Sequence, residues 1–119
     1  MFTQAEAQEF AQQWIRAWNN HDLEAIMSHY ASNVTLTSPV AAKLLNLPSG
    51  TIEGKAALRN YFARGLEAFP QLKFELADVL YGLSSIVLYY INHKGTKTAE
   101  YMEFDANKKV MRVVANYSA

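Results

Sequence analysis

The sequence predicts an α+β domain in which helices come before an antiparallel sheet, and two observations carry this prediction. Apart from one short strand, residues 4–69 hold apolar residues that recur every three or four positions, as in helices facing a core. Residues 72–117 alternate apolar and polar residues between turn signals, as in half-buried strands. Helices segregated from strands along the chain are typical of the α+β class.

The first helix begins at a capping box. The Thr3 hydroxyl is placed to accept from the Glu6 amide, and the Glu6 side chain to reach back to Thr3. Its core-facing stripe consists of Phe10, Trp14, Ala17 and Trp18. The segment 19–21, Asn-Asn-His, breaks the helix because these residues favour caps and turns.

A second helix and the first strand follow this break. Asp22 is a good N-cap, and the second helix continues on one face with Leu23, Ile26, Met27 and Tyr30. The alternation of Val34, Leu36 and Ser38 with polar neighbours predicts a half-buried strand. Because Ser38-Pro39 resembles an N-cap followed by proline at the first helical position, a short helix is expected over 40–47.

The third main helix begins after Gly54 and ends at Pro70. Its apolar stripe is Leu58, Tyr61, Phe62, Gly65, Leu66 and Phe69. Beyond it, strands are predicted over 72–76, 86–91, 96–105 and 110–117, with Lys94-Gly95 as a hairpin and 107–109 as a further turn. The result is a four-stranded antiparallel meander after the helices.

Composition excludes several classes of function. The chain of 119 residues has the size of one domain, 1–119, and 50% hydrophobic residues suffice for a core. Eleven basic and eleven acidic residues are scattered without a basic face, so we expect neither nucleic acid nor a membrane as partner. The absence of cysteine excludes disulfides, thiolate catalysis and cysteine-bound zinc. The N-terminal segment lacks the features of a signal peptide, and a cytoplasmic location is expected.

Three segments make the chain resemble the nuclear transport factor 2-like superfamily, which includes ketosteroid isomerases and SnoaL-like polyketide cyclases. They are W-N-N-H-D-L-E-A-I at the helix break, Y-A-S-N-V at the strand entry and I-E-G-K-A-A-L-R-N-Y-F leading into the helix after Gly54. The resemblance covers essentially the whole chain. It implies a cystatin-like cone, three helices packed on a curved, mainly antiparallel β-sheet, with an apolar cavity inside. These segments are signatures of a fold more than of an activity.

The resemblance argues against steroid isomerisation by the mechanism of ketosteroid isomerases. Where those enzymes have a general-base aspartate, this sequence has Ser38, and where they have an oxyanion-hole tyrosine it has Trp14. Serine is no general base without an activating partner, and an indole donates a hydrogen bond but cannot give up a proton as a phenol can. The position of their protonated aspartate corresponds to Glu100, within a residue of alignment.

Glu100 is the candidate catalytic residue, and the residues alone also lead to it. It shares one face of its predicted strand with Met102 and Phe104, while the opposite face is polar. A carboxyl group buried on that apolar face would have a raised pKa and could act as an acid. The alternative is that Glu100 lies near the strand end and reaches water or a lysine.

The candidate ligand-binding residues are Trp14, Tyr30, Ser38, Tyr61, Phe62 and Met102. Each has an alternative role, since large aromatic residues at helical spacing usually form a core and Ser38 also serves as a cap. No histidine pair has the spacing of a metal site, so we expect neither metal nor cofactor. Segment 40–48 is either a lid over the cavity mouth or a small helix packed at the sheet edge.

Two functions remain open from the sequence. In the first, the cone binds a small apolar or aromatic molecule and catalyses proton transfer next to a carbonyl, as an isomerase, cyclase or dehydratase does. In the second, the domain is a non-catalytic module for dimerisation or protein interaction through the outer face of its sheet. Tyr89, Tyr101 and Tyr117 are candidate contact residues on that exposed face, depending on the register of the strands. The resemblance implies a homodimer through the sheet in either case.

Overall fold

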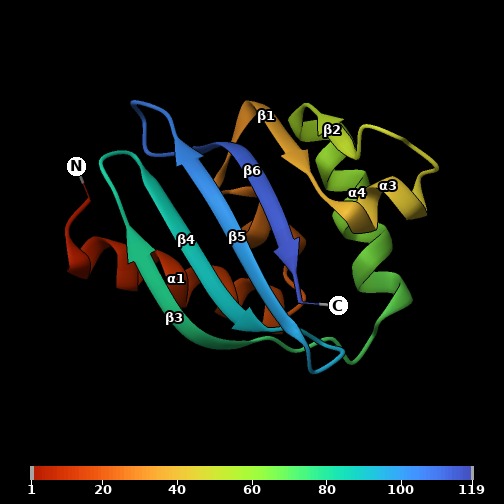
Figure 1. The fold of residues 1–119 in the computed structure, drawn as a ribbon, viewed down its shortest axis with the longest axis horizontal. Helices are drawn as coiled ribbons and strands as arrows, with labels where there is room; N and C mark the ends of the chain where they lie inside the picture. The colour runs from red at the N-terminus through yellow and green to blue at the C-terminus, as the bar shows by residue number, and fades with distance from the viewer. Residues whose placement is uncertain (1, 119) are drawn as a thin grey trace.

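The computed structural model describes residues 2–118 and shows helices packed on one side of a single six-stranded sheet. Figure 1 shows α1 crossing behind strands β3 to β6, with α3 and α4 at the other end of the sheet beside β1 and β2. The strands lie in the order β2-β1-β6-β5-β4-β3. The α+β class and the curved, mainly antiparallel sheet are therefore confirmed.

The helices begin where the capping residues predict. Helix α1 covers Gln4–Asn19, and its capping box forms through the Thr3 hydroxyl and the Glu6 carboxylate. The Asp22 carboxylate caps α2, which covers Leu23–Met27, and the Ser38 hydroxyl caps α3, which covers Pro39–Leu44. Helix α4 covers Lys55–Ala68. There are thus four helices in the described part of the chain: the three expected main helices, and α3, the short helix expected after Ser38.

Four strands form an antiparallel meander, and strands β1 and β2 extend the sheet beside β6. Strands β3 (Glu75–Tyr81), β4 (Ser85–Ile91), β5 (Lys97–Phe104) and β6 (Val110–Tyr117) pair in sequence, each antiparallel to the next. Strand β1 (Tyr30–Thr37) lies parallel to β6, and the short β2 (Thr51–Glu53) covers its other edge. Alternation in β4, β5 and β6 leaves one face buried beneath the helices.

Three expectations about these elements were wrong or incomplete. The strand expected over 72–76 begins only at Glu75 and runs on to Tyr81, because Asn19 holds the Phe74 backbone before it. Tyr30 does not continue the face of α2, because that helix ends at Met27 and Tyr30 already pairs with Val110 at the start of β1. Strand β2 was not predicted at all. Its three residues are too few to show alternation, and pairing with Leu36 and its neighbours on β1 is what forms it.

Candidate active site

Six aromatic side chains fill the space between the helices and the inner face of the sheet. Successive ring centroids lie 4.6–6.0 Å apart, so the rings contact one another in an unbroken cluster. We call this set the aromatic cluster; it consists of Trp14, Trp18, Tyr30, Phe62, Phe74 and Tyr90. The six rings come from five separate segments of the chain, since only Trp14 and Trp18 share an element, so tertiary packing brings them together.

Glu100 lies against this cluster in the middle of β5. Its neighbours across the sheet are Leu88 on β4 and Ala115 on β6, and only 7% of the residue is exposed. The Tyr90 hydroxyl donates a hydrogen bond to Glu100 Oε2. Glu100 therefore lies on the inner face, as the alternation predicted, and the alternative at the strand end with access to bulk water is wrong.

Burial determines the chemistry of this carboxyl group. Removal from water disfavours its charged form and raises the pKa of Glu100 to about 7, while the hydrogen bond from Tyr90 opposes that rise. Burial, followed by the charge of Glu100, also raises the pKa of Tyr90 well above its ordinary value. Near neutral pH, Glu100 thus exists in both protonation states next to a phenol that keeps its proton.

Ser38, Tyr61 and Tyr117 form a further group of hydroxyls, and the two phenols are within reach of the charge of Glu100. Burial raises the pKa of both Tyr61 and Tyr117, the charge of Glu100 adds to the rise, and the Ser38 side chain opposes it at both. Ser38 itself is 3% exposed, and its hydroxyl accepts from the Val40 amide at 3.1 Å. Ser38 is thus both the cap of α3 and a neighbour of the two phenols.

Trp14 and Tyr30 form a second hydrogen-bonded pair inside the cluster. Trp14 Nε1 donates to the Tyr30 hydroxyl oxygen at 2.9 Å, and each of the two residues is 1% exposed. Burial, and then the charge of Glu100, raises the pKa of Tyr30 well above its ordinary value. The indole N–H of Trp14 is therefore engaged by the Tyr30 hydroxyl.

The predicted ligand-binding residues do not all meet at one place. Trp14, Tyr30 and Phe62 belong to the aromatic cluster. Tyr61 is within reach of the charge of Glu100, and Ser38 lies beside Tyr61. Met102 lies one step further along the inner face, paired with Ile86 and Val113, where it is fully buried among aliphatic residues.

Two residues of the site were missed from the sequence. Tyr90 follows Ile86 and Leu88 at every second position of β4, so that alternation could have placed it inside. Tyr117 was a candidate for the outer face, depending on register, but the register of β6 places it on the inner one. It shares its side of β6 with Val113 and Ala115 and pairs with the buried Thr98.

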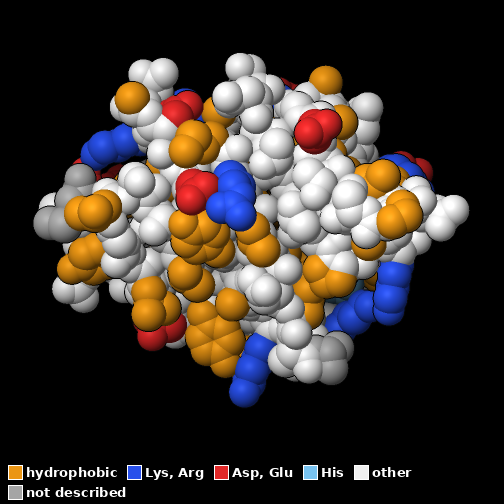
Figure 2. Space-filling view, turned by 45° about the horizontal axis from the view of Figure 1, so that its top comes forward, with side chains coloured by type: hydrophobic (Ala, Val, Ile, Leu, Met, Phe, Trp, Pro, Cys, Tyr) orange, Lys and Arg blue, Asp and Glu red, His pale blue; other side chains and the backbone are white. Residues whose placement is uncertain are grey.

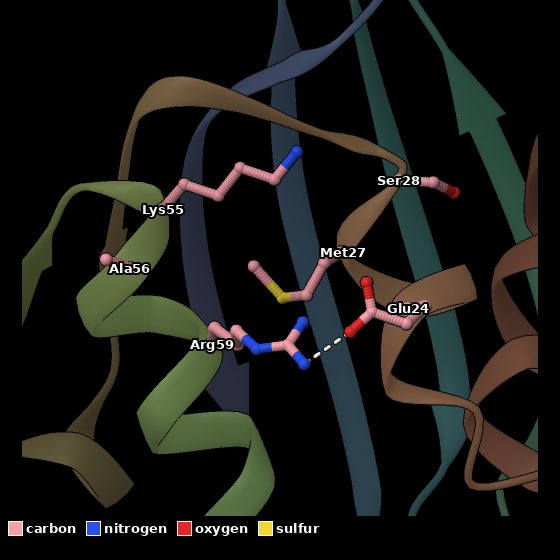
Figure 3. A pocket seen from close by; sticks show the side chains of 6 residues that line it. All are labelled: Glu24, Met27, Ser28, Lys55, Ala56 and Arg59. Carbon is pink, nitrogen blue, oxygen red and sulfur yellow. Dashed lines mark ion pairs between the residues drawn. The ribbon is translucent and has the colours of Figure 1, made fainter.

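Two open surface grooves lie away from Glu100, and the second borders one ring of the aromatic cluster. One, of about 440 Å³, runs between α2 and the start of α4, and Figure 3 shows Met27 at its floor with Arg59 paired to Glu24 across it. The other, of about 380 Å³, lies where β3 and β4 separate and is bordered by Lys73, Phe74 and Asn92 among others. Neither is lined by Glu100, which is 7% exposed.

Within the part of the chain that the structure describes, no three acidic or histidine side chains gather as metal ligands do. Over the same residues, none of the helices has the length and apolar character needed to cross a bilayer.

Fold and site together define a small helix-on-sheet cone with a titratable carboxyl group among aromatic rings. The chain belongs to the SnoaL-like domain family, whose model matches residues 11–117. A crystal structure of a SnoaL-like protein of unknown function from Burkholderia thailandensis is 38% identical, with a TM-score of 0.96 over 98% of each chain. A search of curated proteins gives no match.

More distant solved structures share the fold alone. A protein with a cystatin-like fold from Methylobium petroleophilum is 13% identical, with a TM-score of 0.78 over 99% of this chain and 79% of the other. SalBIII, described as an epoxide hydrolase/cyclase-like enzyme of pyran ring formation in the polyether salinomycin, is 18% identical, with a TM-score of 0.75 over 99% and 95%.

Proposed function

We propose that this protein binds a small apolar or aromatic carbonyl compound in the cone and catalyses proton transfer next to its carbonyl group, with Glu100 as the acid–base residue. The observation that supports this most is the buried Glu100 carboxyl, which accepts from Tyr90 and has a pKa raised to about 7. A group with a pKa near the working pH both takes and returns a proton efficiently.

The surroundings of Glu100 suit such a substrate. Aromatic rings offer flat apolar contact, and the few hydroxyl groups beside the carboxyl fix the orientation of one polar group. Tyr117 is 39% exposed and Tyr61 is half-buried, so this is the side on which the site comes nearest to solvent. We infer that a ligand enters there and displaces these phenols.

The reaction proposed is of the isomerase, cyclase or dehydratase type without a cofactor. Ser38 cannot take the role of a carboxylate base, and the Trp14 N–H is already bonded to Tyr30. A single residue therefore has to remove the proton and return it, which a carboxyl group of raised pKa is able to do. The ring-forming description of SalBIII agrees with this class of reaction.

A ligand screen with matched variants tests this proposal. Hydrophobic ketones should raise the melting temperature of the wild-type protein, and the protein should accelerate exchange of their α-protons in D₂O, followed by NMR. Glu100→Gln should lower that exchange by about 10²–10⁴-fold. Glu103→Gln is the control, because Glu103 lies on the opposite face of the same strand. Equal exchange in both variants, or no response to any ketone, contradicts the proposal.

A second candidate function, dimerisation through the outer face of the sheet, has its own support. A row of partly exposed side chains crosses four strands there: Leu80, Val87, Tyr101 and Val114. Figure 2, which views this side obliquely, shows hydrophobic side chains grouped around a few charged ones. We propose that a second copy of the chain covers this row.

A further inference from the structure

The indole N–H of Trp18 is an anomaly in the interior. Trp18 is 7% exposed, and its Nε1 has no hydrogen-bond partner among the residues that the structure describes. Trp14, one turn earlier on α1, donates from the same atom to Tyr30 at 2.9 Å. Buried polar groups in proteins are nearly always paired, so an unpaired one calls for an explanation.

The neighbours of Trp18 offer the N–H no oxygen or nitrogen acceptor. Its ring contacts Phe62 edge-on at 4.8 Å, Phe74 at 5.5 Å and Trp14 at 5.9 Å, measured between ring centroids. The adjacent Asn19 amide is engaged, since its oxygen accepts from the Phe74 N–H and its nitrogen donates to the Phe74 carbonyl. A contact to an aromatic face is weak and would yield to a true acceptor.

Trp18 belongs to the aromatic cluster and Glu100 adjoins it, but they do not contact the same rings directly. Phe74 and Trp14 each contact both Trp18 and Tyr90, and Tyr90 bonds to Glu100. One ring therefore separates Trp18 from the Tyr90–Glu100 pair. A phenylalanine at position 18 would also fill an aromatic core, and would do so without an unpaired donor.

We propose that Trp18 Nε1 donates to an acceptor oxygen of the bound ligand, at the end remote from Glu100. This inference rests on the proposed function and narrows the substrate class. The substrate is then a flat apolar body with two acceptor oxygens, one at the carbonyl handled by Glu100 and one bound by Trp18. Trp18 discriminates against ligands that lack the second oxygen, because its N–H would remain unpaired.

The first test needs no ligand. Trp18→Phe and Trp14→Phe remove the same atoms from buried positions, but only the second breaks a hydrogen bond. The melting temperature should therefore fall further for Trp14→Phe. An equal or larger fall for Trp18→Phe, or an NMR cross-peak between the Trp18 indole proton and a bound water, shows that this N–H is already paired and overturns the inference.

The second test compares two ligands that differ in one oxygen, 2-acetyl-6-methoxynaphthalene and 2-acetylnaphthalene. Trp18→Phe should weaken binding of the methoxy compound about five- to tenfold, the worth of one hydrogen bond, relative to its effect on the other. The ¹H–¹⁵N resonance of the Trp18 indole should move only with the methoxy compound. Equal losses for both ligands overturn the inference.

Including Glu100→Gln separates this inference from the proposed function. Binding and proton exchange that depend on Glu100 but not on the Trp18 N–H would overturn the role of Trp18 alone. Binding that depends on Trp18, with proton exchange unchanged in Glu100→Gln, would overturn the catalytic role alone. If neither naphthalene binds to the wild-type protein, both proposals are wrong.

Discussion

Glu100 lowers the stability of the fold that encloses it. The carboxyl group is 7% exposed and has no cation beside it among the described ion pairs, so its charge is stabilised mainly by the hydroxyl of Tyr90. Burial without a compensating charge favours the protonated form in the folded state. The same property that suits Glu100 to proton transfer thus makes its ionisation unfavourable, as is common at functional sites.

This leads to a pH dependence of stability with a definite sign. The pKa of Glu100 is about 7 in the folded protein, against an ordinary value of 4.5. Between these values the folded state binds more protons than the unfolded state, so the free energy of unfolding falls as pH rises through this window. The loss is complete only well above pH 7, at about 3 kcal/mol.

Urea unfolding at pH 4.5, 6 and 8 measures this effect. Between pH 4.5 and pH 8, the free energy of unfolding of the wild type should fall by about 3 kcal/mol relative to that of Glu100→Gln. Glu103→Gln serves as the control, since the hydrogen bond from Tyr101 and then that from Arg112 lower the pKa of Glu103. Its contribution is lost only as pH falls below the range tested. Parallel curves for wild type and Glu100→Gln would contradict the raised pKa.

Alternation along a strand was enough to place Glu100 but not its partners. The inner face of β5 carries Met102 and Phe104 beside Glu100, and this pattern is visible in the sequence. The Tyr90 hydrogen bond and the unpaired N–H of Trp18 could not be predicted in the same way. Both depend on how rings from α1, β4 and the segment just before β3 pack in three dimensions, which no local period encodes.

At the scale of elements, the turn from α3 to β2 determines where Ser38 lies. The Ser38 N–H donates to the Gly50 carbonyl at 2.9 Å, and the Ser38 carbonyl accepts from Ala42 at 3.0 Å to begin α3. Gly50 has φ +63°, and a Cβ added there would lie 2.8 Å from the Ser38 carbonyl oxygen. The backbone of Ser38 is thus held by a residue that has to be glycine.

Alanine substitutions at Gly95 and Gly50 separate the cost of a positive φ from the cost of a steric clash with Ser38. Gly95 also has a positive φ, +78°, but open space surrounds it, so Gly95→Ala should cost about 1 kcal/mol of stability from backbone strain alone. Gly50→Ala adds the collision with Ser38 and should cost roughly 2–4 kcal/mol. Urea unfolding of the two variants measures both costs. Equal losses would show that the turn relaxes without moving Ser38.

Elements with strong end signals were predicted well, and those without them were not. The capping box at Thr3, the Ser38-Pro39 cap and the hairpin at Gly95 each fix a boundary by local chemistry, and each is found where expected. Helix α2 lacks an end signal, so Tyr30 was assigned to the wrong element. Whether α3 acts as a lid stays a prediction; its Val40 and Leu44 are 43% and 50% exposed.

At the scale of the whole molecule, the sheet divides two possible roles between its faces. The inner face, covered by the helices, carries the carboxyl group and the aromatic cluster. The outer face carries the apolar row from Leu80 to Val114, next to the ion pair of Arg112 with Glu103 at 3.2 Å. Dimerisation through the outer face would leave the inner site untouched, so the two proposed functions are compatible.

The dimer is tested by placing a charge in the middle of the row. Val114 pairs with Tyr101 on one side and with Thr37 on the other. In a two-fold interface Val114→Lys would introduce two buried ammonium groups, whose loss of water outweighs the remaining contacts. Sedimentation velocity should therefore show a dimer for the wild type and a monomer for Val114→Lys. Leu83→Lys, at a position 75% exposed at the tip of the β3–β4 hairpin, should remain dimeric. A wild-type monomer at every concentration tested, or a dimeric Val114→Lys, would show that this face is not the interface.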